Sequence, residues 1–226
     1  MDRKGRKAMG EGLAARADHS RFVQRIRRRY EAEQDVLPPG LPDVDGITAT
    51  VAALQQRGRT LTSALRVTRQ LVLARLAELD VEQGAALQQI TGAVTHLAEA
   101  TMELALAQAL ADGDERHGVP RNEAGQRIDF WIIGMGKLGA RELNVSSDID
   151  LVYVYEEDGQ TDGAVPISAH EFFSQVARGL YTLIGDTTDD GFVFRVDLML
   201  RPNGNSGPPV VSLAMLEDYL QIQGRE

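Results

Sequence analysis

Residues 134–155 read GMGKLGARELNVSSDIDLVYVY, and this stretch decides the fold. It follows the apolar run FWII at residues 130–133, which is too short for a helix and is bounded by Gly134, so the run predicts a buried strand. Residues 148–155 are rich in β-branched and aromatic side chains and predict a second strand. The sequence therefore predicts two strands joined by a glycine-rich turn.

The chain before residue 120 has the apolar spacing of helices, with apolar residues every three or four positions. The Pro-rich segment LPPGLPD at residues 37–43 interrupts this pattern, because proline removes a backbone donor. The predicted helices span residues 21–30, 47–56 and 61–79, and a further helix carries the stripe Leu87, Ile90, Val94, Leu97 and Leu104.

Beyond residue 120, short apolar runs alternate with glycine. We expect a helix over residues 168–184, where Ser168 and Glu171 form a capping box, a strand over residues 192–200 and a last helix after Ser212. The predicted fold class is α+β. It comprises an α-helical region over residues 1–120, with a basic N-terminal segment, and a small mixed-sheet domain over residues 121–226.

Composition limits the classes of function. The 226 residues include 24 Lys and Arg against 33 Asp and Glu, and a net charge of −9 does not suit a broad nucleic-acid-binding face. The absence of cysteine excludes disulfides, thiolate zinc sites and a cysteine nucleophile. No apolar run approaches the ~20 residues of a membrane span. We expect a cytoplasmic protein with neither nucleic acid nor a membrane as its partner.

The N-terminal segment is the exception to this acidity. Residues 1–30 hold ten Lys and Arg against three acids, whereas the rest of the chain holds fourteen against thirty. Such a basic helix is more typical of a solvated face or a partner-docking segment than of a nucleic-acid arm, and we assign it no function.

The glycine-rich turn also matches a dinucleotide-binding motif. Gly134, Gly136 and Gly139 form G-x-G-x-x-G after a strand, and Glu156 follows at the distance that a ribose-binding acid requires. A parallel crossover, however, needs a helix of about ten residues or more between its strands. Only residues 140–147 intervene here, and they end in poor helix formers, which disfavours a nicotinamide site.

Three acidic residues offer a better interpretation. Asp148 and Asp150 lie two apart on a strand, so they project from one face with Cα atoms about 6–7 Å apart and can converge on a hard cation. In the last predicted strand, alternation places Arg195, Asp197 and Arg201 on one face. The same residues would also suit a salt-bridged strand that faces solvent.

Three acids beside a glycine turn are the parts of two-metal nucleotidyl transfer. The acids would hold two divalent ions about 3.5–4 Å apart. Glycine lets the backbone approach phosphate closely, with amides as donors. Lys137, Arg195 and Arg201 are candidates for neutralising the charge on the phosphates.

The spacing of Gly136 and Asp148-Ile-Asp150 resembles the DNA polymerase β-like nucleotidyltransferase superfamily. More narrowly, GMGKLGARELNVSSDIDLVYVYEEDG and FRVDLMLRPNGNSGP are similar to the bifunctional glutamine synthetase adenylyltransferase and adenylyl-removing family. The likeness is strong over residues 127–226, and residues 20–120 resemble the helical region before the catalytic domain. NVSSDIDL is similar to the N-terminal of two nucleotidyltransferase copies.

The resemblance implies an activity. That copy removes AMP from a glutamine synthetase tyrosine by phosphorolysis and releases ADP, the other copy attaches AMP from ATP, and the uridylylated PII signalling protein stimulates removal. By the resemblance, Asp148, Asp150 and Asp197 would be catalytic and hold Mg²⁺ or Mn²⁺. The residues expected to face nucleotide and phosphate are Gly134, Gly136, Lys137, Gly139, Ser146, Ser147, Arg195 and Arg201.

The sequence also departs from the family pattern. Lys137 stands where the wider superfamily has serine, and the chain stops where the family pattern continues, so we expect an incomplete catalytic domain. Two alternatives stay open. One is a module that binds glutamine synthetase or PII without turnover, and the other is a nicotinamide-dependent oxidoreductase.

Overall fold

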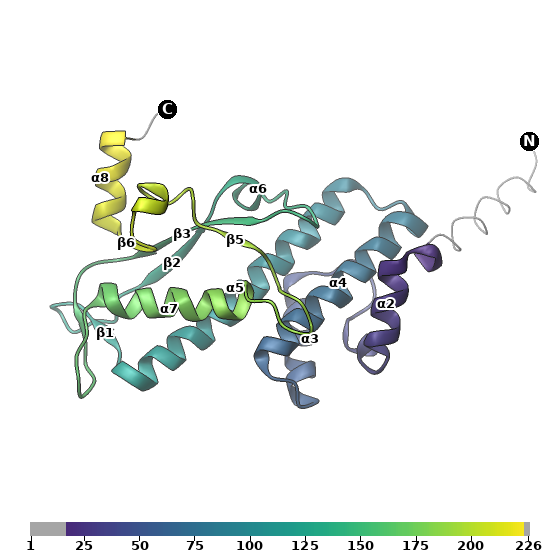
Figure 1. Cartoon of the computed structure of the whole chain (residues 1–226), viewed down its shortest axis with the longest axis horizontal. Helices are drawn as coiled ribbons and strands as arrows, with labels where there is room; N and C mark the ends of the chain where they lie inside the picture. Colours follow the sequence, from purple (N-terminus) through teal and green to yellow (C-terminus); the bar gives the residue numbers. More distant parts are fainter. Residues whose placement is uncertain (1–16, 224–226) are drawn as a thin grey trace, which may run out of the picture. The chain divides into compact units, whose positions relative to one another are not determined.

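A computed structural model of the chain describes residues 17–223 (Figure 1). Residues 1–16 of the basic N-terminal segment lie outside the described residues. The fold is α+β, as predicted: helices precede a small mixed sheet with two further helices. By internal packing the chain divides into two compact units. The predicted division at residue 120 rests on the change from helical spacing to short apolar runs, and it stays a prediction.

Among the described residues, unit 1 contains residues 17–101, 141–146 and 187–193. Its helices are α2 (Arg21–Arg29), α3 (Val44–Gln56), α4 (Leu61–Gln83) and the first part of α5 (Leu87–His117), with short 3-10 turns at Ala17–His19 and Glu31–Val36. Ser20, Asp43 and Thr60 cap α2, α3 and α4 by accepting a backbone N–H, as helix N-termini require. The helices predicted from apolar spacing are therefore confirmed.

Two helices extend past their predicted ends. Helix α4 runs to Gln83, where Gly84 takes the left-handed conformation (φ 64°) and ends it. Helix α5 continues to His117, because buried Ala105 and Ala109 carry the apolar stripe onward with small side chains. The predicted stripe is wrong at its first residue, since Leu87 begins the helix and is 71% exposed.

A loop of unit 1, residues 187–193, is held by polar side chains from α2 and α4. The Asp190 carboxylate accepts hydrogen bonds from Ser63 Oγ at 2.7 Å and the Tyr30 hydroxyl at 2.9 Å. The buried Arg66 donates its Nε–H to the Gly191 carbonyl at 2.8 Å. Burial alone would raise the pKa of Asp190, but these donors and nearby arginines lower it below the ordinary aspartate value.

Unit 2 contains the described residues 102–140, 147–186 and 194–223. Its main sheet has the order β2-β3-β5, with β6 also paired to β3. The strands are β2 (Phe130–Gly134), β3 (Ile149–Tyr155), β5 (Val196–Asp197) and β6 (Val210–Ser212), and a small second sheet pairs β1 (Pro120–Arg121) with β4 (Gln160–Thr161). Helix α6 (Gly136–Gly139) is a single turn between β2 and β3.

Two helices lie on the two faces of the main sheet (Figure 1). Helix α7 (Ala169–Ile184) begins at the predicted cap, where Ser168 Oγ accepts the Glu171 N–H, and its Phe173 stacks on Phe130 and Tyr155. Helix α8 (Leu213–Gln223) follows Ser212 as predicted. Side chains alternate along a strand, so the faces are distinct: Tyr155 points to α7, whereas Leu216 of α8 packs on Val152, Val154 and Val211.

Two strand predictions are wrong in part. The strand expected over residues 192–200 is ordered as a strand only at Val196–Asp197. The Arg201 N–H donates to the Leu198 carbonyl and closes a turn, so the expected alternation ends there and Leu200 is 52% exposed. The FWII run is a strand, but it is not buried throughout: its side chains alternate between half-buried and exposed.

The dinucleotide interpretation is also wrong. Strands β2 and β3 pair antiparallel, with Ile133 opposite Val152, and only the four-residue α6 and a loop connect them. A dinucleotide fold needs a parallel pair joined by a full helix. Among residues 17–223, none of the helices has the length and apolar character that crossing a membrane demands.

Candidate functional site

The predicted acids come together at one end of the main sheet. Strands β3 and β5 run parallel, and Asp150 and Asp197 are partners in register. The Ile149 N–H donates to the Arg195 carbonyl at 2.9 Å, which fixes this register. A pair of residues nearly 50 positions apart in the sequence therefore shares one point on the sheet.

The glycine turn packs against the same acids. The Met135 N–H donates to the Asp150 carbonyl at 2.8 Å, which holds the turn beside the start of β3. Gly136 has φ 53°, and a Cβ at this position would lie 2.7 Å from Asp150 Oδ2. Only glycine combines that conformation with so close an approach, which is the physical reason for Gly136 in the motif.

Packing also explains Gly139. A Cβ there would lie 2.6 Å from the Gly134 carbonyl oxygen, closer than real Cβ contacts. The first and last glycines of the motif therefore let a single helical turn fold back onto β2.

The electrostatics of Asp150 are unusual for an exposed strand end. Burial is the largest cause that raises its pKa, the charges of Asp197 and Asp148 raise it further, and Lys137 opposes them. A carboxylate destabilised by its own neighbours indicates a site that lacks positive charge. Such perturbed groups are concentrated at functional sites.

Asp148 differs from the other two acids. Its Oδ1 accepts the Arg195 Nε–H at 2.5 Å, and both side chains are well exposed. Arg195 therefore already neutralises Asp148, whereas Lys137 is the cation that lowers the pKa of Asp150, and Asp197 Oδ1 accepts the Met199 N–H at 2.7 Å. Lys137 Nζ lies 3.5 Å from Ser147 Oγ, at the edge of hydrogen-bonding distance.

The donor set fits a hard divalent cation in part. The paired carboxylates of Asp150 and Asp197 are oxygen ligands of the kind that Mg²⁺ and Mn²⁺ bind, and the backbone of Gly136 lies close to the Asp150 carboxylate. Across the described part of the chain, however, no three acids or histidines are already spaced around a single ion. Asp148 would have to release Arg195 to become a third ligand.

The remaining predicted residues have other contacts. Arg201 donates Nη1–H to the Leu198 carbonyl at 2.7 Å and Nε–H to the Gly207 carbonyl at 3.3 Å, so its guanidinium holds the turn after β5. Ser146 belongs to unit 1, where its backbone N–H donates to Asn144 Oδ1 at 3.2 Å. Their assignment to phosphate stays a prediction.

Sequence reasoning missed two residues. Trp131 was expected in a buried strand, but it is 41% exposed, and the unbroken apolar run FWII gives no signal of this exposure. Asp190 was not singled out, because its partners Tyr30 and Ser63 lie 160 and 127 positions away in the sequence.

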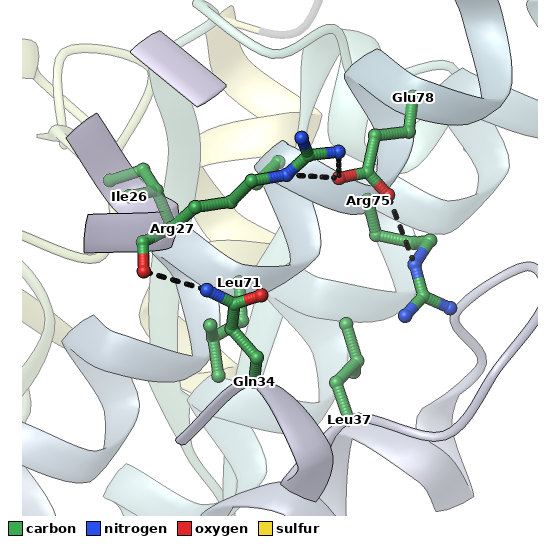
Figure 2. Close-up of a pocket in the computed structure, with 8 residues that line it drawn as sticks. Ile26, Arg27, Gln34, Leu37, Leu71, Arg75 and Glu78 are labelled. Carbon is green, nitrogen blue, oxygen red and sulfur yellow. Dashed lines mark hydrogen bonds and ion pairs between the residues drawn. The ribbon is translucent and has the colours of Figure 1, made fainter. Parts of the chain in front are cut away.

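A small pocket of unit 1 contains an ion-pair cluster instead of site residues (Figure 2). Glu78 accepts two hydrogen bonds from Arg27 through Oε1 and lies 3.7 Å from Arg75 through Oε2. Gln34 donates to the Arg27 carbonyl at 2.7 Å. The cavity measures about 80 Å³ and none of the predicted site residues lines it, so we interpret it as structural.

Comparison with known proteins agrees with the motif. The glutamate-ammonia ligase adenylyltransferase family model matches residues 19–226. A bifunctional glutamine synthetase adenylyltransferase/adenylyl-removing enzyme from Burkholderia mallei is 51% identical over 168 residues, 74% of this chain and 18% of that protein. A protein of the same name from Ralstonia nicotianae is 41% identical over 229 residues, 97% of this chain and 24% of that protein.

Another protein of that name, from Chromobacterium violaceum, is 45% identical over 210 residues, 92% of this chain and 23% of that protein. The chain thus spans about a quarter or less of the length of these curated relatives. Since the family model covers nearly all of the described residues, the chain belongs to the glutamate-ammonia ligase adenylyltransferase family.

Proposed function

We propose that this chain carries the adenylyl-removing site of a glutamine synthetase regulator, which uses Mg²⁺ or Mn²⁺ to transfer AMP from a modified tyrosine to phosphate. One observation carries the proposal most directly: Asp150 and Asp197 are paired in register, with the backbone of Gly136 against Asp150. The similar proteins from three bacteria are named for adenylyl transfer to glutamine synthetase and for adenylyl removal.

The reaction balances without a further reagent. An oxygen of inorganic phosphate forms a bond to the phosphorus of the adenylyl group, and the bond from that phosphorus to the tyrosyl oxygen breaks. The electron pair stays on the tyrosyl oxygen, which takes up a proton from the attacking phosphate or from water. The products are ADP and unmodified tyrosine.

The side chains of this site have separate roles in the proposal. Asp150 and Asp197 would bind the divalent cation, which when bound supplies positive charge to the transferring phosphorus group and its oxygens. Lys137 would neutralise a second phosphate charge, and the backbone around Gly134, Gly136 and Gly139 would approach the phosphate oxygens. Ser147, which belongs to the same unit as the acids, would contribute a hydroxyl donor.

The Asp148–Arg195 ion pair has two possible uses. Arg195 could move from Asp148 to a phosphate oxygen, which would free Asp148 as a further cation ligand. Alternatively the pair persists, and the chain binds its partner without turnover. The Asp148–Arg195 ion pair is the observation that favours the interaction module as a second candidate function.

Partners and location follow from the family resemblance. Glutamine synthetase is the proposed protein substrate, the PII protein is the proposed regulator, and the cytoplasm is the proposed location. The proposed biological role is the regulation of nitrogen assimilation. The dinucleotide alternative is not retained, because β2 and β3 are antiparallel.

A side-by-side assay tests the proposal and its direction. The purified chain is given adenylylated glutamine synthetase with phosphate and Mg²⁺, and in parallel unmodified synthetase with ATP and Mg²⁺. We expect ADP release in the first reaction and little AMP incorporation in the second. Asp150→Asn should abolish ADP release, whereas Glu123→Gln, which removes the charge of an exposed acid elsewhere, should preserve it. Equal rates for wild type and Asp150→Asn would contradict the proposal.

A further inference from the structure

The edge strand β2 carries an exposed apolar pair that the proposed chemistry does not use. Trp131 is 41% exposed and Ile133 is 37% exposed, although both belong to a run that the sequence predicts to be buried. Among the described strands, β2 pairs only with β3. Large exposed aromatic side chains next to a functional site often indicate ligand contact.

Strand register places this pair on the same face as Asp150. Trp131 lies opposite Val154 and Ile133 opposite Val152, and cross-strand partners share a face. Residues 150, 152 and 154 alternate in phase along β3, so the Asp150 side chain projects from that face too. The neighbouring Phe130 points the other way, because its ring stacks on Phe173 of α7 at 5.0 Å.

Helix α8 covers only part of this face. Leu216 packs on Val152, Val154 and Val211, so the helix lies over β3 and β6 and buries those valines. Trp131 and Ile133 on the neighbouring strand keep their exposure. We call these two side chains the Trp131 platform.

The spacing from the acids suits a nucleotide. With about 3.3 Å per strand residue, the Ile133–Val152 pair lies about 7 Å along β3 from Asp150 and the Trp131–Val154 pair about 13 Å. At one end of this face, the carboxylates of Asp150 and Asp197 can bind a cation that in turn binds phosphates. Further along, Trp131 offers an uncharged planar surface. A nucleoside diphosphate carries both complementary ends in a single molecule.

We infer that the Trp131 platform stacks the purine base of the adenylyl group while its phosphates lie at Asp150 and Asp197; this inference rests on the proposed function. Base stacking on an aromatic side chain needs only an accessible π face, and an indole offers the largest. The platform would therefore hold the adenosine moiety during transfer and would favour nucleotides over simple phosphates.

The chain supplies its own reporter for the test. Trp131 is the single tryptophan of the sequence, so its intrinsic fluorescence reports on this position alone. With Mg²⁺ present, we expect ADP to change the Trp131 emission at concentrations that match its calorimetric binding curve. Pyrophosphate supplies phosphates without a base and should bind with Mg²⁺ while leaving the emission nearly unchanged.

Variants of Trp131 distinguish a role in stacking the base from a purely structural role. Trp131→Ala should weaken ADP binding about 5- to 150-fold and leave pyrophosphate binding unchanged. Trp131→Phe, which keeps an aromatic face, should restore most of the ADP affinity. Tyr181→Ala is the matched control, since Tyr181 is an exposed aromatic residue on α7 and its loss should not alter ADP affinity. Thermal unfolding of each variant checks the fold.

Failure of this inference can be told apart from failure of the proposed function. One outcome is that pyrophosphate binds with Mg²⁺, ADP binds no more tightly than pyrophosphate, and the Trp131 emission does not change. This outcome would overturn the stacking inference and leave the proposed metal site supported. If Trp131→Ala weakens ADP and pyrophosphate equally, Trp131 is structural and the inference is overturned. If only the affinity for adenylylated synthetase falls, the face binds the protein substrate instead. If neither ADP nor pyrophosphate binds with metal, both the function and the inference fail.

Discussion

Two aspartates in the two units have opposite electrostatic surroundings. Asp190 of unit 1 accepts hydrogen bonds from Ser63 and Tyr30, with Arg59 Nη1 at 3.5 Å, and its pKa is lowered although burial opposes this. Asp150 of unit 2 has a pKa that is raised, first by burial and then by Asp197 and Asp148. The comparison separates a carboxylate satisfied by its own protein from one that we propose to bind an external cation.

The hydrogen-bond donors around Asp190 also differ from the surroundings of Asp150. Burial and the Asp190 carboxylate raise the pKa of the Tyr30 hydroxyl to about 12, so Tyr30 stays protonated and donates at neutral pH. The donors around Asp190 are thus fixed, whereas Asp150 has Lys137 as the cation that lowers its pKa and the backbone of Gly136 close to its carboxylate. Predicted effects on ligand binding therefore concentrate at Asp150, and predicted effects on stability concentrate at Asp190.

The largest expected effect is on metal affinity. Asp150→Asn removes one of the paired carboxylates, so Mn²⁺ binding should weaken by more than about 100-fold, beyond the loss typical of an indirect metal contact. Asp148→Asn should have a smaller effect, because Arg195 already engages that carboxylate. Calorimetric titration with Mn²⁺ measures both. Equal losses of Mn²⁺ affinity in the two variants would show that Asp148 is a full metal ligand and would contradict the difference between Asp148 and Asp150.

The next largest effect is on the stability of unit 1. Asp190→Ala leaves the Tyr30 hydroxyl, Ser63 Oγ and nearby arginines without their shared acceptor, and should lower the free energy of unfolding by about 2 kcal/mol or more. Asp189→Ala, which alters the exposed neighbour, is the control and should change little. Urea unfolding gives both values. If Asp190→Ala unfolds at the wild-type urea concentration, the loop is not held as described.

Gly136 gives a third, smaller effect. Alanine at a positive φ costs roughly 1–2 kcal/mol of stability, and here its Cβ would also press on Asp150 Oδ2. Gly125→Ala is a matched control: Gly125 has φ 77° with nothing within 4 Å of a new Cβ, so it carries the backbone strain without the contact. We expect both variants to lose stability and only Gly136→Ala to lose Mn²⁺ affinity. Equal Mn²⁺ affinity in the two variants would contradict the close approach of the Gly136 backbone to the Asp150 carboxylate.

The smallest effect is on the pH dependence of stability. A lowered native pKa means that the Asp190 contribution is complete above the ordinary aspartate pKa near 3.9 and is lost as the pH falls through the native value. A raised native pKa means that native Asp150 binds its proton more tightly than unfolded Asp150. Its stabilising contribution therefore appears on acidification and is lost as the pH rises through the native pKa.

The two aspartates therefore change the acid limb of the stability curve in opposite directions. Between about pH 6 and about pH 3, Asp190→Asn should lose stability less steeply than wild type and Asp150→Asn more steeply. Urea unfolding at several pH values measures the slopes. Parallel slopes for all three proteins would contradict the opposite pKa shifts.

Local chemistry made part of the fold predictable. The strand at β2, the strand at β3 and the cap of α7 at Ser168 follow from apolar runs, β-branched residues and hydrogen-bonding side chains that lie close in sequence. The acids of the site were predicted as well, because Asp148 and Asp150 stand on either side of Ile149, the first residue of β3. Their roles as ligands are still predictions.

Contacts between distant residues limited the rest. The last strand is short because Arg201 donates to the carbonyls of Leu198 and Gly207, and this geometry cannot be read from strand propensity. The exposure of Trp131 depends on where α8 lies, and an apolar run does not say which of its faces another element covers. The same limit explains why Asp190 was missed.

The most direct test of the central claim is the binding of ADP with and without Mg²⁺ by calorimetry, for wild type and for Asp150→Asn. If Asp150 and Asp197 form a cation site for nucleotide, wild type will bind ADP only when Mg²⁺ is present, and Asp150→Asn will not bind it in either condition. Binding of ADP that is equally tight without Mg²⁺, or equally tight in Asp150→Asn, would contradict the claim.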